Sequence, residues 1–173
     1  IGFAVDGAKR MQVLINDLLT FSRVGRGNTA HTEVDLQTSL DAALTNLALA
    51  ISESDAQVQS PSEQLPHVDG DPTLLTMLWQ NLIGNAVKFR RPGVAPHIVI
   101  DYREGAVEDC EMWLFTVSDN GIGIGEEFAD KVFVIFQRLH SRDAYSGTGI
   151  GLALCKKIVE YHGGTIRIDT AYT

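Results

Sequence analysis

Apolar residues recur at alternating three- and four-residue steps through the first 24 residues of the chain. This spacing predicts a helix with one apolar side, typical of a coiled coil or helix bundle rather than of a lone surface helix. No N-cap residue precedes the helix, so we expect the chain to be part of a longer protein. Gly25, Gly27 and Asn28 then end the helix. The apolar side consists of Ala4, Gly7, Met11, Leu14, Leu18 and Phe21, widened by Ala8, Ile15 and Leu19.

Length and charge limit the classes of protein to which the chain can belong. Its 173 residues are enough for one core-bearing domain with an appendage. A net charge of −8 argues against nonspecific binding to DNA or to anionic membranes, although backbone N–H groups and Mg²⁺ can still hold a nucleotide. No apolar run approaches the ~18 residues that cross a membrane, and we expect no signal peptide within these residues. Cys110 and Cys155 lack a metal-binding spacing, which favours a reducing cytosol, with Cys155 as a core residue.

The remaining residues predict alternating helices and strands. Asp71 and Pro72 are an N-cap and a first helical residue, and they begin a helix that reaches about Arg90, before Pro92 and Gly93. We expect the other elements as follows: strands over 31–36 and 56–59, the latter within an otherwise loop-like stretch from 52 to 70; a helix over 36–51; a hairpin of 97–103 and 111–118; a short helix over 126–134; a last helix ending at Tyr161; and a strand over 165–170.

The helix that begins at Pro72 carries an unusual polar face. Asn81, Asn85 and Lys88 fall on one side of it, beside an apolar stripe. One interpretation is a solvated polar face. The other is a pair of amide oxygens that bind Mg²⁺, with Lys88 near a phosphate. The stripe expected to face the core is Leu75, Leu78, Leu82, Ala86 and Phe89.

Two glycine-rich segments lie next to regular elements. Asp119–Gly123 follows an apolar strand, and this pattern is either a simple turn or a place where a ligand approaches the backbone. A carboxylate at a strand end can accept a hydrogen bond from an exocyclic amine such as that of adenine. Gly147–Leu152 precedes a helix, where free N–H groups suit phosphates, although an ordinary helix start is the alternative. Neither segment is a P-loop or a dinucleotide fingerprint.

In order and spacing, these segments together resemble the ATP-binding domain of histidine kinases. The resemblance runs from about Val34 to the end, through the boxes Asn81–Phe89, Asp119–Ile124, Phe133–Phe136 and Gly147–Leu152. Residues 10–24 resemble the second helix of the dimerisation bundle, and Phe136–Asp143 resembles the lid of phytochrome-type kinases. We therefore expect a bundle helix over 1–25, a linker over 26–33 and an ATP-binding domain over 34–173.

The resemblance implies a fold, a ligand and a role for each site residue. The fold is an α/β two-layer sandwich in which helices cover a mixed sheet, and the ligands are ATP and Mg²⁺. Asn85 would bind Mg²⁺ with help from Asn81, Lys88 would approach the phosphates, and Asp119 would read the adenine amine. The residues that would surround the nucleotide are Gly121 and Gly123 beside the base, Phe133 and Phe136 anchoring the lid, Arg138 and Arg142 near the γ-phosphate, and Gly147, Thr148, Gly149, Gly151 and Leu152 at the lid hinge and the phosphates.

The implied activity is transfer of the γ-phosphoryl group of Mg-ATP to a histidine, for relay to an aspartate of a response regulator. The resemblance also implies a cytoplasmic, homodimeric phosphoprotein, and it leaves open a membrane anchor in the intact kinase. The first bundle helix with its acceptor histidine and the closing strand after Thr170 are missing, so we expect no self-phosphorylation. Asn81 stands where related ATP-hydrolysing enzymes place a glutamate. The rival hypotheses are a gyrase-like ATPase, a serine kinase of the anti-sigma type and a non-catalytic nucleotide-binding adaptor.

Overall fold

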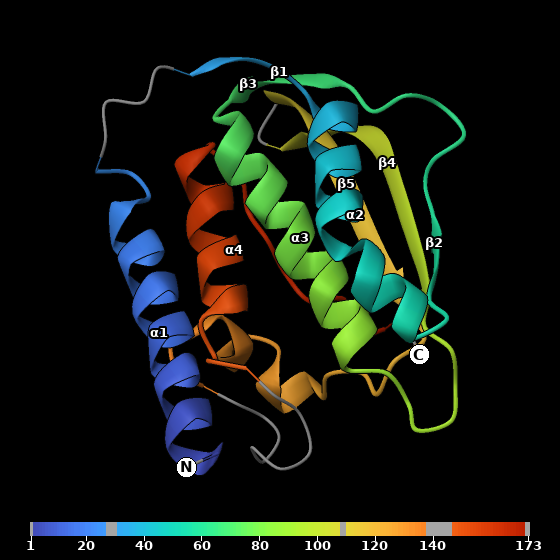
Figure 1. Ribbon diagram of the computed structural model, residues 1–173. Helices are drawn as coiled ribbons and strands as arrows, with labels where there is room; N and C mark the ends of the chain where they lie inside the picture. The colour runs from blue at the N-terminus through green and yellow to red at the C-terminus, as the bar shows by residue number, and fades with distance from the viewer. Residues whose placement is uncertain (1, 27–30, 108–109, 138–146, 172–173) are drawn as a thin grey trace. The chain divides into compact units, whose positions relative to one another are not determined.

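The computed structural model describes residues 2–26, 31–107, 110–137 and 147–171. The chain forms two compact units, one of residues 31–123 and one of residues 1–30 with 124–173. Figure 1 shows the course of the chain and the labels of its elements. No helix within the described ranges is long and apolar enough to cross a membrane.

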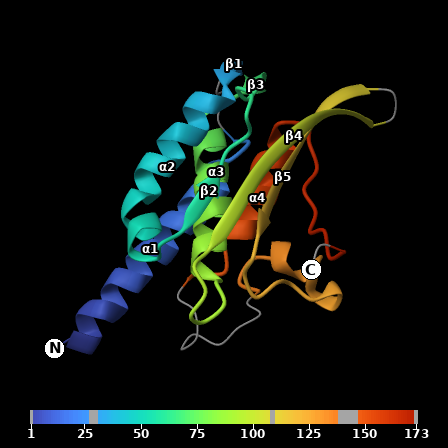
Figure 2. The same cartoon turned by 90° about the vertical axis from the view of Figure 1, so that its right-hand side faces the viewer.

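The unit of residues 31–123 is built from two helices and a mixed sheet. Helices α2 (Leu36–Glu53) and α3 (Pro72–Lys88) cover one face of a sheet with the strand order β2–β4–β5 (Figure 2). β2 (Gln57–Gln59) is parallel to β4 (His97–Val107), whereas β5 (Cys110–Asp119) is antiparallel to β4. The predicted α/β sandwich with a mixed sheet and a β4–β5 hairpin is confirmed.

Carboxylates at the N-caps explain where both helices begin. The Asp35 carboxylate accepts hydrogen bonds from Gln37 N at 2.9 Å and from the Thr38 hydroxyl at 2.9 Å. Asp71 Oδ1 accepts from the N–H groups of the second and third residues of α3, at 2.8 and 3.1 Å. These bonds satisfy donors that a helix leaves unpaired at its N-terminus, and the cap predicted at Asp71 is confirmed.

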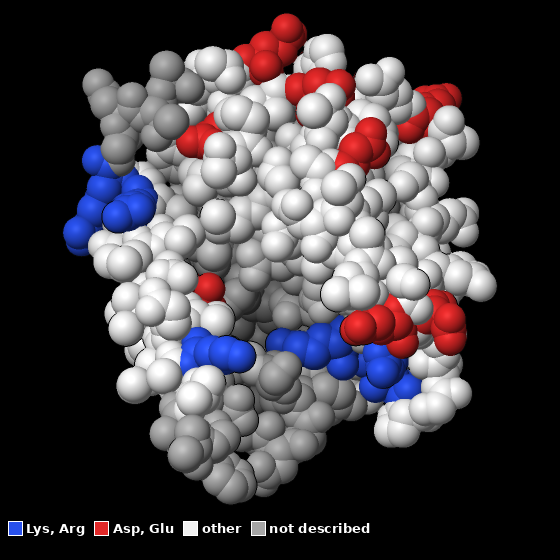
Figure 3. All heavy atoms as spheres, viewed as in Figure 1, with Lys and Arg blue, Asp and Glu red and all other residues white. Residues whose placement is uncertain are grey.

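A further strand pair, β1 (Thr32–Asp35) with β3 (His67–Gly70), joins distant parts of this unit. β3 lies in the stretch that we expected to be loop, and that expectation was wrong. The stretch is polar and contains Pro61 and Pro66, so its strand depends on pairing with β1 and not on a local pattern. His67 lies 3.8 Å from a Glu33 oxygen and 3.9 Å from an Asp35 oxygen across the pair. Acidic side chains are prominent over these strands in Figure 3.

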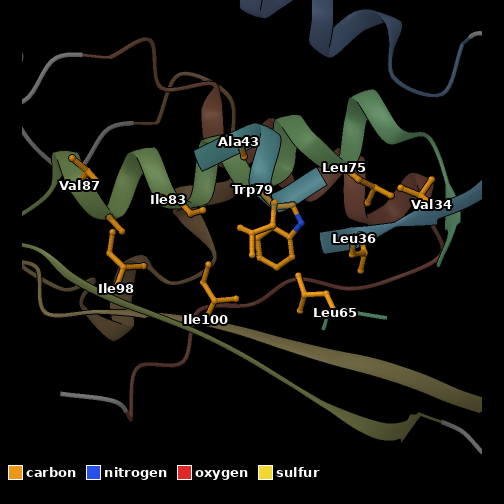
Figure 4. Close-up of a cluster of buried hydrophobic side chains, with 12 residues drawn as sticks. Val34, Leu36, Ala43, Leu65, Leu75, Trp79, Ile83, Val87, Ile98 and Ile100 are labelled. Atoms are coloured by element: carbon orange, nitrogen blue, oxygen red, sulfur yellow. The ribbon is translucent and has the colours of Figure 1, made fainter. Parts of the chain in front are cut away.

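The core of the unit lies between the helices and the sheet (Figure 4). Leu40, Ile83 and Ile98 are completely buried, and burying a side chain of this size stabilises a fold by roughly 1.5–3 kcal/mol. Trp79 is also buried and meets the Phe115 ring edge-on, with the centroids 5.9 Å apart. Among the described residues, its indole Nε1 has no hydrogen-bond partner.

The buried side of α3 differs from the predicted stripe. Leu78 and Leu82 are only half-buried, whereas Trp79 and Ile83 face the core. The reason is the position of the sheet. It packs against Trp79 and Ile83, each of which lies one position after the leucine that we expected to be buried. At ~100° per residue, this places the polar face of Asn81 and Asn85 almost opposite the core instead of beside it. The buried residues of α3 are Leu75, Trp79, Ile83, Ala86 and Val87.

The second unit contains α1 (Gly2–Arg23) and α4 (Gly151–Tyr161), both close to their predicted bounds. Cys155 on α4 is completely buried, and this burial raises the pKa of its thiol to about 12. Its prediction as a core residue is confirmed. α4 ends at Tyr161 and is followed by the C-cap residue His162 and by Gly163, whose φ of +75° suits a glycine just after a helix.

Two sequence expectations in this unit were wrong. The helix expected over 126–134 is two 3₁₀ turns, η1 (Glu126–Phe128) and η2 (Lys131–Phe133). Within the part of the chain that the structure describes, neither turn has a side-chain cap at its N-terminus. The residues of the strand expected over 165–170 are alternately exposed and half-buried, but they form no paired strand among the described residues. Alternation provides the side-chain pattern of a strand, but a strand also requires a hydrogen-bonded neighbour.

Candidate nucleotide-binding site

The polar face of α3 carries the predicted metal-binding and phosphate-binding side chains. Asn81, Asn85 and Lys88 are each half-buried. The Asn81 amide nitrogen donates to Met77 O at 2.9 Å, so its amide oxygen is the atom that can face a ligand. The ammonium of Lys88 lies 4.2 Å from the centroid of the Phe89 ring, at the end of the helix. The arrangement matches the predicted face, but the roles of the three residues stay predictions.

The loop that follows β5 folds back onto the end of α3. Ile122 N donates to Phe89 O at 3.0 Å, and Gly121 N donates to Asp119 Oδ1 at 2.8 Å. The end of the helix that bears Lys88 and the loop that begins with Asp119 are thereby brought together. Asp119 itself is exposed, and one of its carboxylate oxygens accepts a hydrogen bond from Gly121 N within the same loop.

Gly121 and Gly123 have different reasons to be glycine. A Cβ at Gly121 would lie 2.6 Å from both Phe89 O and Asp119 Oδ1, so the loop can approach the helix only without a side chain. Gly123 has a φ of +74° and open space around its Cβ position. Gly121 therefore serves the packing of the loop on the helix, and its place beside a base stays a prediction.

Sequence reasoning assigned no role to two residues that hold this loop in place. Arg91 Nε donates to Gly121 O at 2.8 Å. Asn120 Oδ1 accepts from His97 N at 2.8 Å, and its Nδ2 donates to Ala95 O at 3.0 Å. Asn120 lies inside the glycine-rich motif, which is a local signal for a structural role. The Arg91 bond joins residues 30 positions apart, so no local pattern indicates it.

In the other unit, the glycine-rich segment leads into α4. Gly147 and Gly149 have φ values of +143° and +76°, which favour glycine. Among the described residues, no side chain caps α4 at Ile150, where the helix begins. Such a helix start is suited to binding an anion.

The two phenylalanines predicted to anchor the lid lie in different surroundings, and that role stays a prediction. Phe133 is half-buried in η2, but the Phe136 side chain is 59% exposed. Phe136 is tied through its backbone instead, because its N–H donates to Gly149 O at 3.0 Å. Its φ of +65° is uncommon for a residue with a side chain. Arg138 and Arg142 lie outside the described residues.

Thr148 and Lys157 connect α4 and its preceding loop to α1. The Thr148 hydroxyl donates to Asp17 Oδ2 at 2.6 Å. Lys157 Nζ donates to Phe21 O at 2.7 Å and lies 4.4 Å from the centroid of the Phe21 ring. Phe21 is thus engaged within its own unit. Several other apolar residues of α1 are exposed, namely Val5, Met11, Val13, Ile15, Leu18 and Leu19.

Comparison with known proteins identifies the family. Residues 70–173 match the family described as histidine kinase-, DNA gyrase B- and HSP90-like ATPases. The chain belongs to this ATPase family. Cyanobacterial phytochrome A of Nostoc sp. is 48% identical over 98% of the chain, which accords with the phytochrome-like lid motif. The match covers 21% of that relative, so the chain spans about a fifth of its length.

Solved structures agree with this assignment. The mycobacterial sensor histidine kinase MprB is 27% identical, with a TM-score of 0.64 over 80% of this chain and 85% of that one. Full-length ShkA in complex with AMPPNP shares the fold at a TM-score of 0.73, over 94% of this chain and 33% of that one, at 24% identity. The chain is therefore the histidine-kinase type of this ATPase domain, as found in two-component sensor kinases.

The donor set of α3 suits the Mg²⁺ that accompanies ATP in such a domain. Among the described residues, no group of three or more histidines, cysteines and carboxylates could hold a metal alone. Mg²⁺ typically takes only one or two protein oxygens and completes its shell with phosphates and water. The amide oxygens of Asn81 and Asn85 therefore fit the ion.

Proposed function

We propose that the chain is the ATP-binding catalytic part of a sensor histidine kinase that presents Mg-ATP to a histidine of a helix bundle. The observation that carries this proposal is the hydrogen bond from Ile122 N to Phe89 O. It holds the loop of Asp119 at the end of the helix that bears Asn85 and Lys88. Candidate partners for the base and for the phosphates therefore gather at one end of one helix.

Each residue has a task in this proposal that its surroundings support. Asp119 Oδ2, the oxygen not bonded to Gly121 N, accepts a hydrogen bond from the adenine amine. Asn85, assisted by Asn81, supplies neutral oxygens to the metal. Lys88 leaves its position over the Phe89 ring to reach a phosphate, and cation–π contacts of this kind contribute only ~0.5–1 kcal/mol at exposed sites.

Phosphoryl transfer to histidine depends mainly on positioning and neutralisation of charge. ATP supplies the transferred group, and the acceptor is a ring nitrogen with its own lone pair, so no strong base is needed. Asn81, which replaces the glutamate of ATP-hydrolysing relatives, supports transfer over hydrolysis. In the other unit, the start of α4 after Gly149 offers backbone N–H groups of the kind that bind phosphates.

The exposed apolar side of α1 supports the proposal that another helix of a bundle packs against it. Met11 is 62% exposed, and Ile15 and Leu18 lie on the same side of the helix. In the proposed whole kinase, this side packs with the helix that bears the acceptor histidine and with a second copy of the chain. The phosphoryl group then passes to an aspartate of a response regulator.

Calorimetry with an asparagine variant tests the nucleotide site. Asn85→Ala is expected to weaken Mg-ATP binding by about tenfold or more, because a metal ligand is lost, and to change the affinity for metal-free ADP by less than about threefold. Asn46→Ala, a variant of an exposed α2 asparagine that bonds to Gln80, is the matched control and should bind both nucleotides normally. Equal losses of ATP and ADP affinity in Asn85→Ala would contradict the Mg²⁺ assignment.

Acceptor specificity separates the kinase from its rivals. A peptide or separate helix pair bearing the acceptor histidine should receive an acid-labile phosphoryl group from the chain and Mg-ATP. A serine kinase of the anti-sigma type would instead form an acid-stable phosphoserine. A gyrase-like ATPase would release phosphate without labelling either acceptor, and a non-catalytic adaptor would bind ATP without turning it over.

A further inference from the structure

Arg91 holds the carbonyl of the glycine at the centre of the Asp119 loop. Its Nε donates to Gly121 O at 2.8 Å, although Arg91 belongs to the segment that follows α3. Gly121 N donates to Asp119 Oδ1 at 2.8 Å, and the next residue, Ile122, donates to Phe89 O at 3.0 Å. Both peptide groups of Gly121 are therefore fixed, one by the Asp119 side chain and one by Arg91.

The backbone of Arg91 is fixed as well. Val94 N donates to Arg91 O at 3.1 Å, which closes a turn over residues 91–94. Pro92 and Gly93 occupy the central positions, and Gly93 has a φ of +74°. This is the residue pattern of a type II turn, with proline at its second position and glycine at its third. The guanidinium thus extends from a rigid base, two residues beyond the Phe89 carbonyl that receives Ile122.

These contacts have a consequence for the Asp119 carboxylate. Arg91 and Phe89 O hold the two ends of the peptide that joins Gly121 to Ile122. With this peptide held, the backbone at Gly121 has less freedom to turn its N–H away from Asp119 Oδ1. A charged donor to a carbonyl is stronger than a neutral one. Because Oδ1 is held by Gly121 N and the carboxylate is rigid, the hydrogen bonds of the loop also determine the direction in which Oδ2 points.

We propose that Arg91 is a specificity-determining positioning residue that acts through Gly121 to aim the Asp119 carboxylate at the adenine amine. The proposal rests on the nucleotide site described above and adds a residue outside the glycine-rich motifs. Arg91 acts on the loop and not on the phosphates, so its loss lowers discrimination between bases and not phosphate binding in general.

ATP and ITP are the probes that test this role in the full chain. ITP has a carbonyl oxygen where ATP has the amine, so it cannot donate to Asp119, but it carries the same phosphates. Calorimetry should show that the unaltered chain prefers ATP. Arg91→Ala should lose about tenfold in ATP affinity and change ITP affinity less than about twofold, as expected for one charge-assisted hydrogen bond. Arg91→Lys should recover part of the preference, and Arg103→Ala, on the exposed side of β4, should change neither affinity.

A second arm tests the route through Asp119. In an Asp119→Asn background, Arg91→Ala should reduce ATP affinity by less than about twofold, because the two residues act through one contact. Amide hydrogen exchange at Ile122 should accelerate in Arg91→Ala without nucleotide, while the urea midpoint stays near that of the unaltered chain. Equal losses of ATP and ITP affinity would show a phosphate contact or a folding defect and overturn the proposal, as would additive losses in the double variant.

The same measurements separate this proposal from the proposed function. If the unaltered chain binds neither nucleotide, the nucleotide site itself is wrong and the role of Arg91 fails with it. If the chain binds ATP and ITP equally, nucleotide binding stands but adenine reading by Asp119 and its positioning by Arg91 are both refuted. If it prefers ATP and Arg91→Ala keeps the full preference, only the proposal for Arg91 is refuted.

Discussion

Replacing Gly121 by alanine is expected to release the Asp119 loop from the end of α3. The new Cβ would lie 2.6 Å from Phe89 O and 2.6 Å from Asp119 Oδ1, closer than carbon and oxygen can approach. Neither oxygen can move without weakening the bonds from Ile122 N and Gly121 N. One neutral hydrogen bond and one to a carboxylate contribute together about 2–4 kcal/mol. We therefore expect a loss of stability within that range and a fall in ATP affinity of at least about tenfold.

Urea unfolding and ATP calorimetry of the same samples measure both effects of Gly121→Ala. Gly84→Ala is the matched control, because Gly84 lies inside α3 and its Cβ would make an ordinary contact with Leu47 at 3.6 Å. That variant should be more stable by roughly 0.5–1 kcal/mol, as alanine favours a helix over glycine. If Gly121→Ala keeps both its unfolding free energy and its ATP affinity, the tight approach of loop and helix is refuted.

Three further outcomes are expected from other parts of the chain. The hydrogen bond from Thr38, followed by those from backbone N–H groups and the charge of His67, lowers the pKa of Asp35 below its ordinary 3.8, so this stabilisation is present above pH 3.8 and is lost as the pH falls through the folded pKa. Thr38→Ala should therefore lower the urea midpoint at pH 6, and its difference from the unaltered chain should shrink toward pH 3. The Cys155 thiol, with its pKa raised to about 12, should react with iodoacetamide at pH 8 only on unfolding, measured by mass spectrometry in a Cys110→Ser background; rapid labelling of the folded chain would contradict its burial. The chain incubated alone with Mg-ATP should form no phosphohistidine, since none of its five histidines has the expected acceptor setting, and mass spectrometry at alkaline pH would reveal an exception.

Local signals account for the parts of the fold that the sequence predicted well. Asp71 followed by Pro72 marks a helix start through bonds to the next residues, and the structure contains those bonds. β3 escaped prediction because its strand character comes from β1, more than thirty residues earlier. The stripe of α3 was misplaced because Leu78 and Leu82 fit a helical period as well as Trp79 and Ile83 do. Only the position of the sheet decides which of the two sets is buried.

In the candidate site, too, the features that depend on neighbouring residues could be predicted, and those that depend on contacts between distant residues could not. The glycine-rich pattern predicted a ligand loop after β5, since strand, carboxylate and glycines are adjacent in the chain. Position 121 requires a glycine because the loop packs against Phe89 O, and the Gly121 carbonyl is held by a hydrogen bond from Arg91. No spacing rule connects these residues, because the contact exists only once β5 lies against the end of α3.

The two tryptophans give the unit of residues 31–123 two natural fluorescent reporters. Trp79 is buried without a hydrogen-bond partner for its indole N–H among the described residues, so its emission should be blue-shifted. Trp113 is 39% exposed beside Tyr102 and should emit at longer wavelength. A Trp113→Phe chain would then report the α3–sheet core alone. Its emission would follow unfolding of that core without any added dye.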